Sequence, residues 1–424
     1  MKQKTYKRKR IIPIGWKEIK LGDVFRTSSG STPLSTEKSY YEGGVIPWIN
    51  SGELASPYIY KTSNYITQKG FENSSTELYP KDTVLVAMYG ATAGKASLLK
   101  LEACTNQAIC AILPNEDYCP EFIKYNIDTL YEHLVGLSSG SARDNLSQAG
   151  LKELKLVLPK TKKEQEKLVS VLSLLDRKIE LNRQINDNLE AMAKQLYDYW
   201  FVQFDFPNEE GKPYKSSGGA MVWNEKLKRE IPQGWSNGVL SDVANITMGQ
   251  SPDGSSYNED GKGIIFYQGS TDFGLRFPDI RQYTTSPSRY ANKGDILMSV
   301  RAPVGALNIA NNDCCIGRGL SALSSKIGSM THLYYLMNDF RLKFAGMNSA
   351  GTTFGSITKD ELFSLPIVIP TKSVISEFEQ VCEPIFDKQM IIGEEINALT
   401  KQRNELLPLL MNGQATINYH LSDD

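Results

Sequence analysis

Side chains that can read the edges of DNA bases recur in two distant parts of this sequence. Four stretches are rich in Ser, Thr, Gly and Asn, at residues 28–36, 138–147, 249–258 and 348–358. In the major groove an arginine makes two hydrogen bonds to guanine, and an asparagine or glutamine makes two to adenine. The candidates in these stretches or beside other turns are Asn50, Ser51, Tyr89, Asn106, Gln107, Arg143 and Asn145 in the first half and Gln250, Ser251, Gln268, Ser270, Arg301, Arg318, Thr352 and Thr353 in the second. Any one of them could simply be a solvated loop residue or a turn former, so the prediction of DNA contact rests on the set.

The sequence offers no comparable set of catalytic residues. The stretch "YGATAGKAS" at Tyr89 differs from a phosphate-binding loop, because only three residues separate Gly90 from Gly94 and Ala96 replaces the Ser or Thr that holds magnesium. An NPPY-type tetrapeptide for amino-group methylation, a dinucleotide-binding glycine fingerprint and a convincing nuclease carboxylate cluster are all missing from the sequence. We therefore predict a binding protein that is not catalytic by itself, with no metal site and no cofactor of its own.

The charge balance restricts how the chain could bind DNA. It has 47 Lys and Arg against 48 Asp and Glu, for a net charge of −1. A protein that binds DNA by its overall charge is usually strongly basic. Local basic patches, or a partner that supplies positive charge, are therefore needed. One such patch is the run of lysines and arginines within residues 2–10, which suits either a solvated tail or phosphate contact.

The cysteines and the hydropathy pattern favour the cytoplasm. The six cysteines form no CxxC pair and are expected to be buried free thiols. The basic start of the chain is not followed by the apolar stretch that a signal peptide would have. The sequence also has no run of about 18 apolar residues, the length needed to span a membrane.

The candidate residues belong to a repeat that extends over nearly the whole chain. "IPIGWKEIKLGDV" at Ile12 returns as "IPQGWSNGVLSDV" at Ile231, with Trp16 and Trp235 lying 219 residues apart. The offset falls to 211 from Asn106 onward, where "NQAICAI" faces "GRGLSAL". The frame is repeated while the loops differ, which indicates two similar domains whose loops recognise different features.

Each copy is predicted to be a mixed α/β domain followed by a long helix. Apolar runs such as "DTVLVAM" at Asp82 and "GDILMSV" at Gly294 suit buried strands, and "LKLVLP" and "LPIVIP" suit final strands stopped by proline. The helix after the first copy, over residues 164–201, is expected to pack through Leu168, Leu175, Asn182, Leu189 and Leu196 together with Val171, Lys178, Ile185, Met192 and Tyr199.

The helix after the second copy is predicted over residues 374–410. Its stripe is Phe378, Val381, Ile385, Ile396, Leu399, Leu406 and Leu410, while Pro384 and Gly393 are expected to make it less regular. Because each stripe is too long for one domain to cover, the two helices are expected to pack together, antiparallel, with a globular domain at each end. Asn182 is either a buried residue that fixes the register or a residue at a loose, wet contact.

Longer motifs carry a resemblance to a known family. The two "IPxGW" motifs, "LEAMAKQLYDYWFVQFDFP" after the first helix, "GKPYKSSGGAMVWNEKLKREIPQGW" between the copies and "RNELLPLLMNGQ" near the end resemble the specificity (S) subunit of type I restriction-modification systems. The resemblance implies target recognition domains at residues 1–160 and 231–370, conserved helices at 161–206 and 371–424, and a linker at 207–230. The two tryptophans are expected to be core or helix-docking residues.

The resemblance also implies partners. Each recognition domain would read one half of a split, asymmetric double-stranded DNA site, and the helices would set the spacing and dock two modification (M) subunits. These subunits bind S-adenosylmethionine and methylate adenine, and two restriction (R) subunits that use ATP and Mg would join them. The alternatives are an enzyme that acts by itself and a coiled-coil scaffold without sequence preference.

Overall fold

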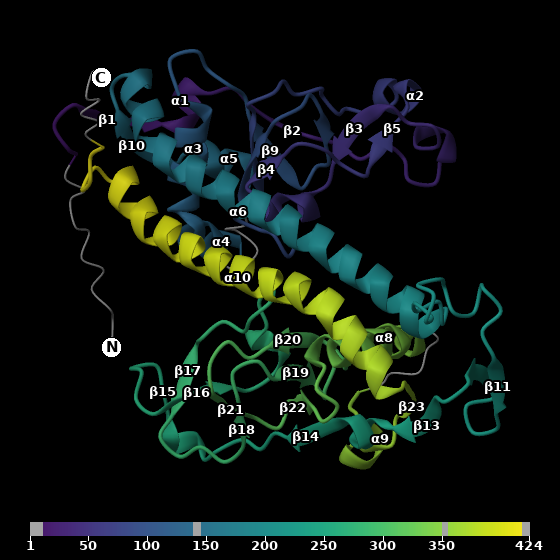
Figure 1. Cartoon of the computed structure of the whole chain (residues 1–424). Coiled ribbons are helices and arrows are strands. Elements are labelled where there is room, and N and C mark those ends of the chain that lie inside the picture. Colours follow the sequence, from purple (N-terminus) through teal and green to yellow (C-terminus); the bar gives the residue numbers. More distant parts are fainter. Residues whose placement is uncertain (1–11, 139–145, 350–354, 418–424) are drawn as a thin grey trace, which may run out of the picture. The chain divides into compact units, whose positions relative to one another are not determined.

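The protein forms two compact units, each of which contains one copy of the repeat. In the computed structural model, residues 12–138, 146–349 and 355–417 are described (Figure 1). One unit contains the residues up to 180 and those from 398 onward, and the other contains residues 181–397. Both long helices, α6 (Lys162–Tyr197) and α10 (Lys372–Met411), contribute a segment to each unit.

The first unit is built on three sheets. A two-stranded pair joins β1 (Trp16–Lys20) to β10 (Lys155–Pro159), so the beginning and the end of the domain meet. The five-stranded sheet has the order β2 (Thr27–Ser29), β9 (Ile109–Ile112), β6 (Val84–Ala87), β7 (Ala96–Leu99) and β4 (Tyr58–Ile59). The smaller sheet has the order β5 (Tyr65–Ile66), β3 (Ile46–Ile49) and β8 (Cys104–Thr105). The helical elements are α1 (Leu21–Val24), η1 (Lys38–Tyr40), η2 (Ser51–Ala55), α2 (Gln68–Glu72), α3 (Pro120–Asp128), α4 (Tyr131–Ser138) and α5 (Gln148–Lys152).

The central strand β6 has the continuous apolar sequence expected of a strand that is buried on both faces. Val84 and Val86 point to the core that contains α3 and the start of α6. Leu85 and Ala87 alternate with them and point to a second core against the smaller sheet. The run "DTVLVAM" is therefore a buried strand, as predicted.

The second unit repeats this plan. Its terminal pair joins β13 (Ser236–Val239) to β23 (Pro366–Ile369). The four-stranded sheet has the order β14 (Ala244–Met248), β22 (Leu320–Ser325), β19 (Ile296–Ser299) and β20 (Leu307–Ile309). The five-stranded sheet has the order β15 (Tyr257–Asn258), β17 (Gln282–Thr284), β16 (Ile264–Tyr267), β21 (Cys314–Ile316) and β18 (Tyr290–Ala291). The helical elements are α7 (Leu240–Val243), η4 (Gly254–Ser256), η5 (Ser270–Asp272), α8 (Met330–Ser349) and α9 (Lys359–Phe363). The internal repeat and the mixed α/β class are thus confirmed.

The stretch between the copies has more structure than the linker predicted at 207–230. A single π-helical turn, η3 (Asp198–Val202), follows α6, and β11 (Met221–Asn224) pairs antiparallel with β12 (Arg229–Pro232). Phe206 stacks on Tyr214 with 4.6 Å between ring centroids and on Trp235 with 5.1 Å. The aromatic residues of this stretch therefore belong to a core that they share with the end of α6 and the start of α10.

The two "IPxGW" tryptophans pack where each domain meets a long helix. Trp235 is buried and contacts Phe201 and Phe204, which directly follow α6. Trp16 packs on Phe122, and a side chain at Gly413, just beyond α10, would lie 3.1 Å from the Trp16 ring. The prediction of a core or helix-docking role is confirmed for both residues.

The long helices run antiparallel and side by side in the second unit. The Asn182 side-chain amide donates to Glu395 at 2.8 Å, and the Gln389 amide donates to Glu190 at 2.9 Å, so the numbering rises on α6 as it falls on α10 (Figure 1). Asn182 is 3% exposed and therefore occupies the buried seam rather than a loose contact. The predicted antiparallel pairing is confirmed.

The second stripe predicted on α6 is wrong. Ile185 is 44% exposed and Met192 is 53% exposed, whereas Leu172, Ile179 and Ala193 are buried. The second row of buried residues in the seam therefore lies four residues, not three, after the members of the first stripe. In that first stripe Leu168 is buried with Asn182, while Leu175 and Leu189 are half-buried. The sequence misleads because the true stripe includes Asn186 and Ala193 and looks less apolar than the exposed one.

Helix α10 follows the prediction more closely. Ile396 is buried, and Leu399 and Leu406 are half-buried, but Val381 is exposed and does not belong to the seam. The helix continues without a break through Pro384 and Gly393. A side chain at Gly393 would lie 2.8 Å from Phe277, so this glycine permits the domain to pack closely on the helix.

The corrected seam makes a direct prediction for stability. Leu172→Ala is expected to lower the free energy of unfolding by about 2–4 kcal/mol, because it opens a cavity in a filled core. Leu174, two residues away, is 63% exposed, and Leu174→Ala is expected to change stability by less than about 0.5 kcal/mol. Urea denaturation of both variants measures the difference, and equal losses would contradict the corrected seam.

Candidate nucleic-acid interface

Strand register brings four loops of the first unit to one end of its sheets. Ser29, the last residue of β2, pairs with Cys110 at the start of β9, and Ala87 at the end of β6 pairs with Ile109. In the smaller sheet Ile49 at the end of β3 pairs with Thr105 at the end of β8. The loops that leave or enter these strand ends cover residues 30–36, 50–53, 88–95 and 106–108.

These loops are held against one another by main-chain and side-chain contacts. The Ser31 N–H donates to the Thr105 carbonyl at 2.9 Å, and the Thr32 hydroxyl donates to the Gln107 side chain. A Cβ at Gly30 would clash with Thr105, so glycine is required for this approach. The Thr92 hydroxyl donates to the Ser51 carbonyl at 2.7 Å and ties the 88–95 loop to the same end.

The predicted residues of the first unit lie together here, but they have different roles. Asn50 caps η2 by accepting from the Gly52 N–H at 2.9 Å, and Asn106 accepts from the Ala108 N–H at 3.1 Å. Both amides therefore shape their loops, and Ser51 is half-buried beside Asn50. Gln107 is exposed, and Tyr89 is 50% exposed. The last two are the residues best placed to reach a ligand.

The second unit has an equivalent set of loops. Met248 pairs with Ser321, Ser299 pairs with Leu320, and Tyr267 pairs with Ile316, which places residues 249–256, 268–272, 300–306 and 317–319 at one end. A Cβ at Gly249 would clash with the Gly317 carbonyl, so this glycine is required as Gly30 is. The repeat therefore preserves the close approach of two loop backbones at this glycine, while the neighbouring side chains differ between the two units.

The predicted residues of this unit present longer side chains. Gln250, Gln268, Arg301 and Arg318 are exposed. Ser251 accepts from the main-chain N–H of Arg318 at 3.3 Å and so fixes that loop. The remaining predicted residue, Ser270, is half-buried at the start of η5.

Positive charge is concentrated at this end of the second unit. Arg289 is exposed, and its carbonyl accepts from the Ile316 N–H at 2.9 Å. The Ile316 carbonyl in turn accepts from the Gln250 N–H at 3.0 Å, so Arg289 lies close to Gln250. An acidic residue, Asp253, is also present, and the Ser255 hydroxyl and N–H that donate to it hold its pKa below the ordinary value. Arg289 was missed from the sequence because it stands in a short Ser-Pro segment outside the four loop-like stretches.

Four predicted residues, Arg143, Asn145, Thr352 and Thr353, lie outside the described residues. The segment next to them contacts the loop end in the second unit, whereas in the first unit the adjoining contact lies at the start of β2. The Gln148 amide donates to the Thr27 hydroxyl at 3.0 Å in the first unit. In the second, Arg301 forms a bridge with Ser356, and the Ala302 N–H donates to the Gly355 carbonyl at 3.1 Å.

The described residues offer no metal centre beside these loops. In residues 12–138, 146–349 and 355–417 no group of three or more His, Cys, Asp and Glu side chains is placed to hold a metal ion. All six cysteines are free and buried, as predicted. None of the described helices has the length and apolar character of a membrane span.

Two α/β domains of one plan, each with differing polar loops at one sheet end, define a protein that recognises two different surfaces. The sequence model described as "Type I restriction modification DNA specificity domain" matches residues 13–191 and again 232–407. The chain therefore belongs to the specificity subunits of type I restriction-modification systems, and its repeated domains are the two target recognition domains.

Individual relatives agree with this assignment. The type I restriction enzyme MjaIX specificity subunit of Methanocaldococcus jannaschii is 29% identical over 96% of this chain and 95% of its own length. The putative type I restriction enzyme MjaX specificity subunit of the same organism is 33% identical over 65% of this chain and 62% of its own length. The crystal structure of a type I S subunit from M. genitalium has the same fold, with a TM-score of 0.57, 16% identity and 99% coverage of both chains.

Proposed function

We propose that each target recognition domain reads one half of a split, asymmetric double-stranded DNA site. The observation that carries the proposal is the pair of corresponding loop ends, in which a common scaffold presents different side chains. Tyr89 and Gln107 project from the first unit, and Gln250, Gln268, Arg301 and Arg318 project from the second. Different polar groups at corresponding places favour different bases, so the two half-sites differ.

The paired helices are proposed to set the spacing between the half-sites and to bind two modification subunits. The segment of α6 in the second unit, with the turn that follows it, exposes a row of large apolar side chains: Leu181, Ile185, Met192, Tyr199 and Val202. They recur at helical spacing on one face, and a hollow of about 730 Å³ lies along it between Ala191 and Gln203. An exposed row of large apolar side chains on one helix face suits a protein partner.

The catalytic groups of the complex are assigned to its other subunits. The two modification subunits would bind S-adenosylmethionine and methylate adenine. Two restriction subunits would join them and use ATP and Mg for cleavage. This chain would supply recognition and no cofactor site, and it would act in the cytoplasm, where the DNA is found. The near-neutral charge of the chain fits a complex in which flanking subunits add phosphate contacts.

The proposal is tested by co-expressing the chain with its modification subunit in a host free of adenine methylation and mapping methylated adenines across the genome. A split motif with a fixed gap is expected. Replacing residues 249–256 and 300–306 by loops of another family member is expected to change one half of the motif only. A stable complex without any methylation would instead favour a scaffold, and methyl transfer by the chain alone would show it to be an enzyme.

The docking face makes a separate prediction. Ile185→Asp combined with Met192→Asp is expected to weaken binding of the modification subunit at least about tenfold, because two charges would have to be desolvated in an apolar contact. Folding is expected to persist, since both side chains are exposed. Asp187→Lys, at an exposed position on another face of α6, is the control. Unchanged affinity of the double variant, measured by calorimetry, would exclude this face as the docking site.

A further inference from the structure

A pocket outside the DNA-reading loops lies where the segment after α6, the start of the second domain and the start of α10 meet. It has a volume of about 600 Å³. The floor is the buried aromatic stack of Trp235, Phe206 and Tyr214, and Val374 contributes from α10. Because these residues belong to the frame rather than to the reading loops, a ligand here would be common to the complex and not to one DNA sequence.

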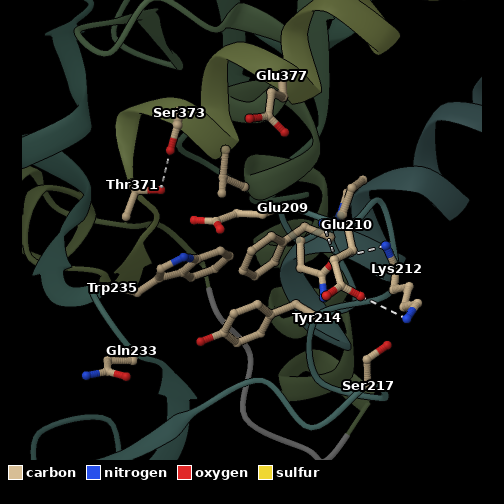
Figure 2. Close-up of a pocket in the computed structure, with 14 residues that line it drawn as sticks. Glu209, Glu210, Lys212, Tyr214, Ser217, Gln233, Trp235, Thr371, Ser373 and Glu377 are labelled. Atoms are coloured by element: carbon tan, nitrogen blue, oxygen red, sulfur yellow. Dashed lines mark hydrogen bonds and ion pairs between the residues drawn. The ribbon is translucent and has the colours of Figure 1, made fainter.

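Two acidic side chains stand at the mouth of the pocket without a counter-charge. Glu209 and Glu377 are exposed, and no lysine, arginine or histidine of the described residues lies within ion-pair distance of either. The third carboxylate, Glu210, is paired with Lys212 at 2.8 Å. Figure 2 shows Glu209 and Glu377 on the side of the pocket where Ser373 also lies, away from the Glu210–Lys212 pair.

The floor of the pocket also contains an unused hydrogen-bond donor. Trp235 is only 7% exposed, yet its indole N–H has no acceptor among the described residues. Figure 2 shows this nitrogen at the ring edge on the side of Glu209 and Thr371. The indole nitrogen is not one of the fully buried polar atoms that lack a partner, so it borders the open pocket and can donate to an acceptor on a ligand.

We propose that this pocket binds a basic peptide segment of the modification subunit, an inference that rests on the function proposed above. A main-chain carbonyl of the segment accepts from the Trp235 N–H. A neighbouring arginine or lysine lays its aliphatic part on the aromatic floor and pairs its head with Glu209 and Glu377. Nucleic acid is disfavoured as the occupant because two unpaired carboxylates repel phosphate.

The position of the pocket supports a modification subunit as the source of the segment. The exposed apolar row begins on α6 and ends at Tyr199 and Val202 of η3, only a few residues before Phe206 in the pocket floor. A partner that covers the row could therefore extend a segment into the pocket. The apolar row would give affinity, and the acidic pocket would give orientation, because opposite charges across an interface fix its register.

The test measures how tightly the full chain binds the purified modification subunit when it carries both Glu209→Gln and Glu377→Gln, in comparison with the wild-type chain. Binding is expected to be on the order of ten-fold weaker, because two charge-assisted contacts are lost. The affinity of the double variant is also expected to fall less steeply with rising salt concentration. A merely structural effect would lower the affinity without changing this salt dependence. The control is Glu230→Gln with Glu383→Gln, two exposed glutamates of the same unit that do not line the pocket, and it is expected to match the wild type.

The result separates this inference from the proposed function. Unchanged affinity and salt dependence in the double variant would overturn the pocket assignment, even if the complex methylates a split site. A gain in DNA binding with no change in subunit assembly would also overturn it, because the carboxylates would then act only on nucleic acid. Conversely, a wild-type complex that assembles but methylates no split motif contradicts the proposed function and leaves the binding comparison interpretable. Trp235→Phe, which keeps the ring and removes the N–H, is expected to weaken assembly in the same direction.

Discussion

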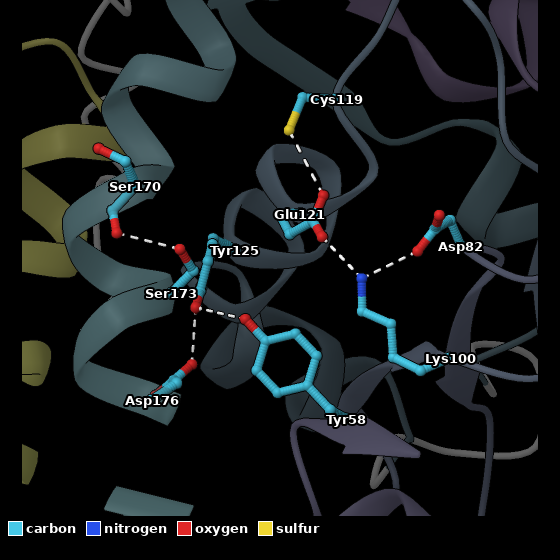
Figure 3. A network of polar contacts seen from close by, with 9 residues as sticks. All are labelled: Tyr58, Asp82, Lys100, Cys119, Glu121, Tyr125, Ser170, Ser173 and Asp176. Atoms are coloured by element: carbon cyan, nitrogen blue, oxygen red, sulfur yellow. Dashed lines mark hydrogen bonds and ion pairs between the residues drawn. The ribbon is translucent and has the colours of Figure 1, made fainter. Parts of the chain in front are cut away.

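Replacing Asp176 with alanine is expected to lower the free energy of unfolding by about 3–5 kcal/mol, the cost of breaking a buried charge cluster from one side. Asp176 is 4% exposed on α6 and accepts from the Tyr125 hydroxyl at 2.7 Å, as Figure 3 shows. The cations Lys124 and Arg403 lie 4.0 and 3.7 Å from its carboxylate. Without Asp176, Lys124 on α3 and Arg403 on α10 both lose a carboxylate that offsets their positive charge.

The network around Asp176 explains why the loss should be large. Lys124 is 1% exposed, and its other partner is Asp128 at 2.8 Å. The Tyr125 hydroxyl also lies 2.9 Å from the Tyr58 hydroxyl, so Asp176 is connected to the sheet through two tyrosines (Figure 3). Burial is the main cause that raises the pKa of Tyr125, which therefore remains a neutral donor to the carboxylate.

Urea unfolding measures this effect, with Asp187→Ala, an exposed aspartate on the same helix, as the matched control. The control is expected to change stability by less than about 0.5 kcal/mol. Asp176→Asn keeps an acceptor for Tyr125 but removes the charge, so it is expected to lie between the two. If Asp176→Ala unfolds with the same midpoint as the control, the cluster does not hold the domain on the helices.

The repeat made most of the fold predictable. The two "IPxGW" motifs and the paired final strands fixed where each domain begins and ends, because β1 pairs with β10 and β13 with β23. Continuous apolar runs indicated strands buried on both faces. Such runs are informative because successive side chains of a strand point to opposite faces, so a strand that is buried on both faces is apolar at every position.

The packing face of α6 could not be predicted in the same way. Its seam accepts Asp176 and Asn182, which are polar, because the first domain offers a partner to Asp176 and α10 offers partners to both. Only the folded chain assembles these partners. The more apolar alternative, with Ile185 and Met192, faces outward. A hydrophobic pattern identifies the faces that avoid water, but it does not distinguish packing within the chain from packing on another subunit.

The reading loops were partly predictable for a related reason. Matching positions of the repeat located the loops, and strand register then brought them to one end. Which amides face outward was not predictable, since Asn50 and Asn106 turn inward to bond main-chain N–H groups. Asparagine is common in turns for this reason, so its presence in a loop is weak evidence of base contact.

Arg301→Ala combined with Arg318→Ala is expected to reduce methylation of the complete site by on the order of 100-fold, because each contact between an arginine and a guanine contributes roughly 1–3 kcal/mol of discrimination. Both side chains are exposed at the loop end of the second domain. The motif is expected to become relaxed in one half only, since the loops of the first domain are unchanged. Genome-wide mapping of methylated adenine measures the rate and the motif together.

The same measurement distinguishes base contact from phosphate contact. Arginines that bind only phosphate would lower methylation at all sequences and leave the motif intact, with a weaker dependence on salt. Lys262→Ala, at an exposed position before the opposite end of β16, is the control and is expected to leave both halves unchanged. A double variant that methylates the original motif at the original rate would remove both arginines from the reading surface and shift the assignment to Gln250, Gln268 and Arg289 at the same end of the sheets.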